Sequence, residues 1–150
     1  MKKLISISLI LSLALLCFTA CSTEIRITGE RYTDYEGVYI TVESTAVAEN
    51  NSRLLNVTWH NETEDYVTFG LWYTVEYLDG DEWRNIQIVD YAIPEIACHL
   101  EANSTGQQKY TTKYFNMLRE GRYRIRTEFY VPEKDVGTRS TYATFEVRYL

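Results

Sequence analysis

The sequence predicts an all-β protein, an antiparallel β-sandwich of about seven strands, and three observations lead to this prediction. Apolar and polar residues alternate with a period of two along most of the chain after residue 36. Thirteen tyrosines among 150 residues, together with many Thr and Val, suit a pleated, half-buried surface. Turn residues separate the alternating runs, and no strand-helix-strand order is visible. A closed barrel is the alternative architecture.

Five runs carry the alternating pattern, which is typical of antiparallel strands with one face on the core and the other in solvent. They are Val38–Glu43, Leu55–His60, Leu71–Tyr77, Arg122–Val131 and Ala143–Tyr149. Asp79-Gly80-Asp81 joins the third run to a segment that begins near Trp83, an order that predicts a β-hairpin. Glu120-Gly121 and Lys134–Thr138 indicate further turns.

The first twenty residues have the composition of an export signal. Lys2 and Lys3 precede an uncharged apolar stretch that ends at Ala20 and is shorter than the roughly 20 residues of a permanent membrane span. Phe18-Thr19-Ala20-Cys21 resembles the bacterial lipobox, with Phe18 where Leu is most common. The resemblance implies cleavage before Cys21 and a diacylglyceryl group on its sulfur. A plain secreted protein or a single-span anchor is the alternative.

These features predict three parts of the chain. We expect a lipoprotein signal peptide at residues 1–20, a lipidated N-terminus and polar tether at residues 21–35, and one sandwich domain at residues 36–150. Each buried methylene contributes about 0.8 kcal/mol, so several acyl chains hold a protein on a membrane for good. The expected location is the extracytoplasmic face of a cell membrane.

The net charge of the chain and its cysteines limit the kinds of partner and the covalent bonds that we expect. The net charge of −6 becomes −8 once Lys2 and Lys3 leave with the signal peptide, because residues 1–20 contain no acid. Such an acidic domain is not expected to have nucleic acid or an anionic lipid surface as its main partner. Cys17 leaves with the signal peptide and Cys21 carries lipid, so Cys98 has no partner for an internal disulfide. We expect Cys98 to act as a small buried apolar residue.

A local motif points to a particular kind of sandwich. Leu118-Arg119-Glu120-Gly121-Arg122-Tyr123-Arg124-Ile125 resembles the L-x-x-G-x-Y-R segment of immunoglobulin-like domains. The resemblance implies that Tyr123 forms a tyrosine corner, in which the hydroxyl bonds to upstream backbone.

The wider pattern is similar to a family of bacterial Ig-like domains found in exported lipoproteins, largely of Gram-positive bacteria. It runs through Trp59-His60-Asn61, Phe69-Gly70 and the Tyr73–Trp83 hairpin before the corner motif, and covers about residues 36–149. It implies an immunoglobulin-like sandwich and nothing about a ligand, because function lies in sites added to a fold.

The sequence contains no recognisable catalytic motif. His60 and His99 are its two histidines, and no Ser elbow, Gly-rich phosphate loop or HExxH is present. Asp79, Asp81 and Glu82 cluster in a tight turn without the spacing of a calcium loop. We therefore expect neither catalysis, nor a metal site, nor a cofactor.

The candidate binding face consists of arginines and a tryptophan. Arg122, Arg124 and Arg126 fall two residues apart on one strand, and Arg148 lies on the final strand, which we expect to be a neighbour. A cationic face would favour an anionic partner, such as a carboxylate-rich protein or a wall polymer. The alternative is that these arginines pair with Glu128, Glu146 and other acids across strands. Trp72, like Trp83, Tyr130 and Tyr142, is expected to face away from the main apolar stripe, as an aromatic platform. The alternative is that loops or the neighbouring hairpin cover these rings.

Three functions remain open on this basis. The favoured hypothesis is a membrane-anchored lipoprotein with a non-catalytic module that binds another envelope protein. A cell-wall glycan binder is the second, and it requires an exposed aromatic pair. An envelope enzyme is the third, and it requires a cleft with perturbed acids or histidines.

Overall fold

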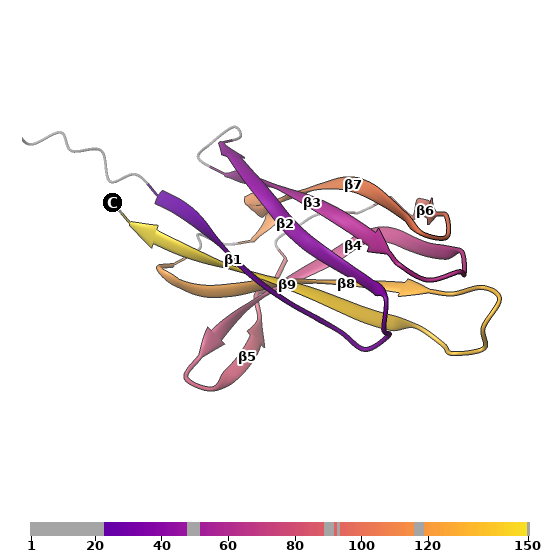
Figure 1. Ribbon diagram of the computed structural model, residues 1–150. Helices are drawn as coiled ribbons and strands as arrows, with labels where there is room; N and C mark the ends of the chain where they lie inside the picture. Colours follow the sequence, from indigo (N-terminus) through magenta and orange to yellow (C-terminus); the bar gives the residue numbers. More distant parts are fainter. Residues whose placement is uncertain (1–22, 48–51, 89–91, 93, 116–118, 150) are drawn as a thin grey trace, which may run out of the picture.

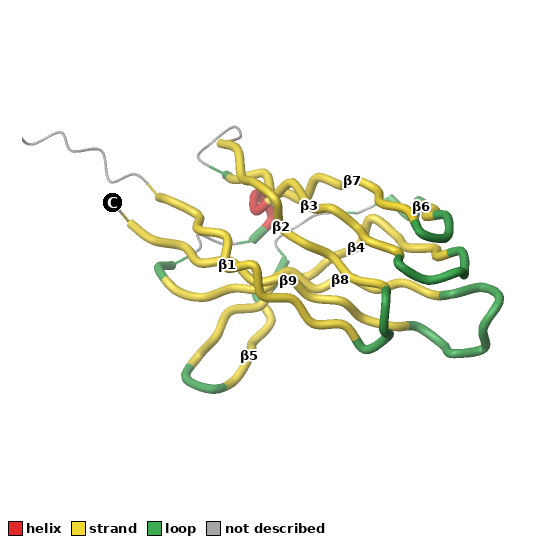
Figure 2. The backbone as a smooth tube through the Cα atoms, in the orientation of Figure 1, coloured by secondary structure: helices red, strands yellow, loops and turns green. Residues whose placement is uncertain are grey.

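The computed structural model describes residues 23–47, 52–88, 92, 94–115 and 119–149. The predicted signal peptide and Cys21 lie outside these residues. Within them, two antiparallel sheets pack face to face, so the predicted sandwich is confirmed (Figure 1). Strands and loops make up nearly all of the described chain (Figure 2). No helix in this part of the chain is both long enough and apolar enough to cross a membrane.

The larger sheet has six strands and the smaller sheet three. The order in the larger sheet is β1-β9-β8-β4-β5, with β6 also paired to β4, and the order in the smaller is β2-β3-β7. The larger sheet contains β1 (Thr23–Thr33), β4 (Val67–Asp79), β5 (Glu82–Asn85), β6 (Ala97–Leu100), β8 (Gly121–Tyr130) and β9 (Arg139–Tyr149). The smaller contains β2 (Val38–Val47), β3 (Arg53–Asn61) and β7 (Ser104–Thr111), and a 3-10 turn, η2 (Thr112–Tyr114), follows β7.

The core lies between the sheets and is centred on Trp59 of β3, which is fully buried. The Trp59 ring stacks on Phe69 of β4, with centroids 4.1 Å apart, and meets Phe129 of β8 edge-on at 6.1 Å. Its indole N–H donates to the Tyr110 hydroxyl at 3.4 Å, which gives both buried polar groups a partner. The apolar positions of the five predicted runs supply most of the remaining core, as their alternation predicted.

The predicted tether is wrong for residues 23–33, which form β1. This strand pairs with β9 from Thr23 opposite Tyr149 to Thr33 opposite Thr141. Ile25 and Ile27 pack against the core, and a register shift follows Ile27. Two apolar residues are too few to show a period of two in the sequence. The strand is stabilised by pairing with the edge of β9, and residues 23–33 alone do not reveal that contact.

Two turns position strands of the larger sheet, one where the chain enters β8 and one between β4 and β5. Tyr123 is buried, and its hydroxyl donates to the Arg119 carbonyl oxygen at 2.7 Å, which is the bond of a tyrosine corner. The Tyr123 ring also stacks on Phe145, with centroids 5.6 Å apart. In the β4–β5 hairpin, Gly80 has a φ of +64°, a conformation that glycine adopts without strain.

We predict that Tyr123→Phe lowers the free energy of unfolding by about 1 kcal/mol, because the hydrogen bond from the buried Tyr123 side chain to the Arg119 carbonyl is lost. Urea unfolding followed by circular dichroism measures this change. Tyr32→Phe is the control, because Tyr32 is 60% exposed and its substitution should cost less than about 0.5 kcal/mol. Equal costs for the two variants would contradict a structural role for the corner.

Stability should also fall at alkaline pH. Burial raises the pKa of both Tyr110 and Tyr123 above the ordinary tyrosine value of about 10. The unfolded chain therefore ionises first, and stability that is complete below pH 10 declines as the pH rises above it. Urea unfolding between pH 9 and pH 11 (about one unit either side of 10) should show this decline. Tyr110→Phe should make it shallower, and an unchanged slope would contradict the prediction.

Candidate functional site

The outer face of the larger sheet, which points away from the smaller sheet, carries arginine and aromatic side chains side by side. On β8, the residues between the buried Tyr123, Ile125, Thr127 and Phe129 point outward, as the alternation requires. All five residues of the predicted binding face lie on this surface. We call it the Arg-aromatic face, and it consists of Tyr32, Trp72, Trp83, Arg122, Arg124, Arg126, Tyr130, Tyr142 and Arg148.

Arg124 occupies the centre of the Arg-aromatic face. Its guanidinium carbon lies 4.5 Å from the ring centroid of Trp83 and 4.4 Å from that of Tyr142. Its Nε also forms an ion pair with Glu76, whose side chain is only 7% exposed, against 23% for Arg124. Because ring faces attract cations, Arg124 joins aromatic residues of β5 and β9 across β8. Its main effect is therefore to order this face rather than to offer free charge.

The other predicted arginines also contact carboxylates. Arg122 pairs with Glu30 of β1, Arg126 with Glu128 at 2.9 Å, and Arg148 with Glu146 at 2.8 Å. Arg126 donates in addition to the Ser140 hydroxyl at 3.2 Å. Each of the four arginines thus has an acidic partner, which is the alternative that the sequence left open. The charge of the face is nearly balanced, so attraction of an anionic partner is weak.

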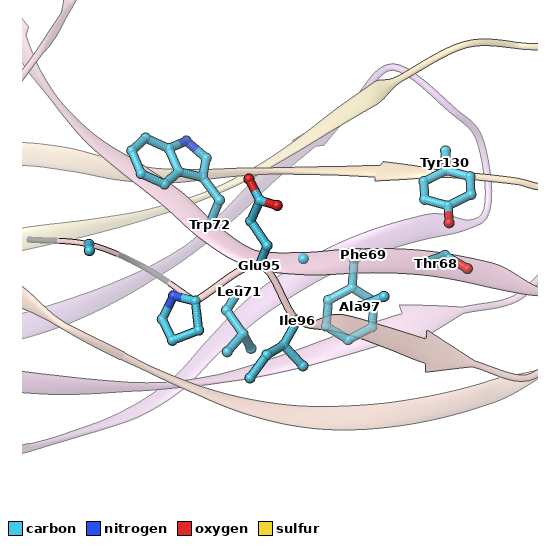
Figure 3. A pocket seen from close by; sticks show the side chains of 11 residues that line it. Thr68, Phe69, Leu71, Trp72, Glu95, Ile96, Ala97 and Tyr130 are labelled. Carbon is cyan, nitrogen blue, oxygen red and sulfur yellow. The ribbon is translucent and has the colours of Figure 1, made fainter.

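An apolar groove borders the Arg-aromatic face where β4, β6 and β8 meet. It has a volume of about 620 Å³. Trp72 is 50% exposed, Tyr130 48% and Ile96 51%, and Figure 3 shows Trp72 and Tyr130 toward opposite ends of the groove. Pro94, Glu95 and Thr68 also line it. Exposed aromatic groups beside an apolar hollow are a common feature of binding surfaces.

A β-bulge in β4 places Trp72 at this groove. The pairing of β4 with β8 shifts register between Phe69 and Tyr73, so the Trp72 carbonyl leaves the regular ladder. The buried Thr127 hydroxyl donates to that carbonyl at 3.0 Å. This role of Thr127 was not predicted from the sequence. The available signal was a polar residue at an inward position of an otherwise apolar run.

The two histidines lie on different sheets. His60 of β3 stacks on Tyr39, with centroids 4.6 Å apart, and its Nε2 lies 2.9 Å from the Thr41 hydroxyl. Burial lowers the pKa of His60, which favours the neutral ring. His99 of β6 lies with Nδ1 2.6 Å from the Tyr66 hydroxyl. Both rings are engaged in local surface contacts.

The remaining reactive side chains, a cysteine and the acids of the β4–β5 hairpin, contact other residues of the fold. Cys98 is partly buried, is a free thiol, and packs against the core as expected. Asp79 and Glu82 at the hairpin pair with Arg84, at 3.1 Å and 3.5 Å. Among the described residues, no group of three or more His, Cys, Asp or Glu side chains is placed to hold a metal ion.

Comparison with known proteins adds one match. Residues 34–146 match the protein family described as a bacterial Ig-like domain. No curated protein matches the chain in sequence.

We predict that Arg124→Ala lowers the free energy of unfolding by about 2–4 kcal/mol, because it leaves the Glu76 carboxylate buried without its partner. Arg126→Ala should cost less than about 1 kcal/mol, because the Arg126–Glu128 pair is exposed. Urea unfolding of the two variants provides the comparison. The double variant Arg124→Leu with Glu76→Leu should lose less than Arg124→Ala alone, and a larger loss would refute the argument.

Proposed function

The chain belongs to the bacterial Ig-like domain family, and from this premise we propose that it is a membrane-anchored lipoprotein whose non-catalytic domain binds another protein of the cell envelope. Family membership supports the non-catalytic interaction module. The Arg-aromatic face is the single observation that carries the choice of a binding surface.

The anchoring part of the proposal rests on the N-terminal sequence. Lys2 and Lys3, the uncharged apolar stretch and Phe18-Thr19-Ala20-Cys21 follow the order of a lipoprotein signal. Lipidation at Cys21 would place the domain on the extracytoplasmic side of a membrane. The domain would then meet proteins and polymers of the envelope.

A protein partner fits the composition of the Arg-aromatic face. Trp, Tyr and Arg are the residues that contribute most often to the energy of protein interfaces. Arg124 is already held between two rings and a carboxylate, so little side-chain freedom is lost when a partner binds. Trp72 and Tyr130 are exposed and supply the apolar area that a partner would cover.

A wall glycan is the second candidate. Trp72 and Tyr130 both line the groove and are half exposed, so they form the exposed aromatic pair that this function requires. The exposed Glu95 adds a polar group to the lining, as small-ligand sites usually have. The sugar ring would stack on an aromatic face and bond to this carboxylate.

We expect that crosslinking in intact cells, followed by purification of the full-length protein, recovers one protein partner. The double variant Trp72→Ala with Tyr130→Ala should lose it, because it removes the two exposed aromatic side chains that line the groove. Thermal unfolding should change little, since both side chains are half exposed.

The control is Gln107→Ala with Lys109→Ala on β7, whose side chains are exposed on the other sheet. Cys21→Ala tests whether recovery requires the anchor. Retention of the partner by the aromatic variant would show that another surface binds it. Recovery of wall glycan alone would replace the protein partner with the second candidate.

A further inference from the structure

The sandwich begins almost directly after the proposed lipidation site. Thr23 is already paired with Tyr149 of β9, and Ser22 alone separates it from Cys21. Two residues of extended chain reach about 7 Å at most. The lipid-bearing residue is therefore held within that distance of one particular end of the domain. We call it the near end, and it contains the start of β1, the end of β9, η2 and the turn at residues 119–121 (Figure 1).

The opposite end of the sandwich, which we call the far end, is strongly acidic. It consists of four loops, at residues 34–37, 62–66, 101–103 and 131–138 (Figure 2). Backbone bonds join three of these loops, from Glu62 to Gly37 and from Asn103 to Thr63, and Lys134 pairs with Asp65 of the second loop. Lys134 is their one cation, against the acids Asp34, Glu36, Glu62, Glu64, Asp65, Glu101, Glu133 and Asp135.

The near end, by contrast, has no excess of acidic side chains once its described residues are counted together. Its described residues include the cations Arg53, Lys113, Arg119 and Arg148, against Glu24 and Glu120. The β4–β5 hairpin lies at the same end and adds Asp79, Asp81 and Glu82 with Arg84, but it projects to one side of the sheet (Figure 1). The charge of the domain is thus concentrated away from the point where the chain enters.

We propose that the near end docks on phospholipid headgroups, so that the strands run away from the membrane and the acidic far end points outward. This inference rests on lipidation of Cys21, which belongs to the proposed function. The short connection brings Arg53, Lys113, Arg119 and Arg148 close to the headgroups, which are anionic in part and attract such side chains. A domain lying flat would instead bring the acidic loops against the same surface.

The length of the strands keeps the far end beyond the range of the electrostatic field at the membrane surface. β9 spans eleven residues, which corresponds to about 33 Å at the usual rise per residue. That distance exceeds the screening length of about 10 Å at 0.1 M salt. Tyr130 pairs with Thr68 near the start of β4, so the groove lies in the outer half of the domain. Docking would therefore leave the groove open to a partner.

Quenching of a fluorescent label by spin-labelled headgroups tests the orientation. Glu120→Cys at the near end and Glu133→Cys at the far end are a matched pair, because both side chains are exposed glutamates. Each is made in a Cys98→Ala background, and lipidation leaves Cys21 without a reactive thiol. The lipidated protein is placed in vesicles of phosphatidylglycerol and phosphatidylethanolamine. We expect several-fold stronger quenching at residue 120 than at residue 133.

Two further measurements distinguish failure of the anchoring from failure of the docking. The mass of the N-terminal peptide shows whether Cys21 carries lipid, and its absence would overturn both the anchor and the docking. Lipid on Cys21 with equal quenching at the two positions would overturn the docking alone. A flexible Gly-Ser linker of about ten residues inserted after Ser22 should reduce the difference, because its ends separate freely by about 18 Å. An unchanged difference would show that the short connection is not what orients the domain, and that repulsion of the acidic far end from the headgroups suffices.

Discussion

The packing of Trp59 between the sheets is the constraint on which the rest of the structure depends. Trp59 contacts Phe69 and Phe129, so it determines which side of β4 and which side of β8 face inward. In a strand, a shift of one residue would move every side chain to the opposite face. The positions of Arg124 and Trp72 on the outer surface therefore follow from the burial of an indole that they do not touch. A binding surface on this sheet is as rigid as the core behind it.

Much of the fold was predictable because the core strands repeat their pattern over enough residues. Val38, Trp59 and Ile125 belong to such runs, and all are buried. β1 was missed because its apolar run stops after Ile27, and its stability comes from pairing with β9, a long-range contact. β7 was also missed, because Tyr110 is the one residue of that strand classed as buried. Nine strands are present in the described residues where about seven were expected.

The outward direction of the candidate residues was predictable from the alternation, but their electrostatic surroundings were not. Alternation places Arg124 on the outer face, whereas its partner Glu76 lies on a strand 48 residues earlier. Only the pairing of β4 with β8 brings the two together. The groove depends on a bulge between Phe69 and Tyr73, and Gly70 within it was the available signal, because a glycine inside a strand often marks a bulge. The local pattern predicts the direction in which a side chain points, whereas its contacts depend on which strands pair in the sheet.

The pairing of β1 with β9 has a mechanical consequence. Under the proposed anchoring, the membrane holds the first residue of β1, and a partner on the Arg-aromatic face would pull on the neighbouring strands. The force then acts along the strands, and it loads the backbone bonds between Thr23 and Thr33 in parallel rather than one after another. A ladder sheared in this way resists far more force than one peeled from its end. Under that anchoring, the edge strand would be the attachment through which tension passes from the lipid layer to a partner.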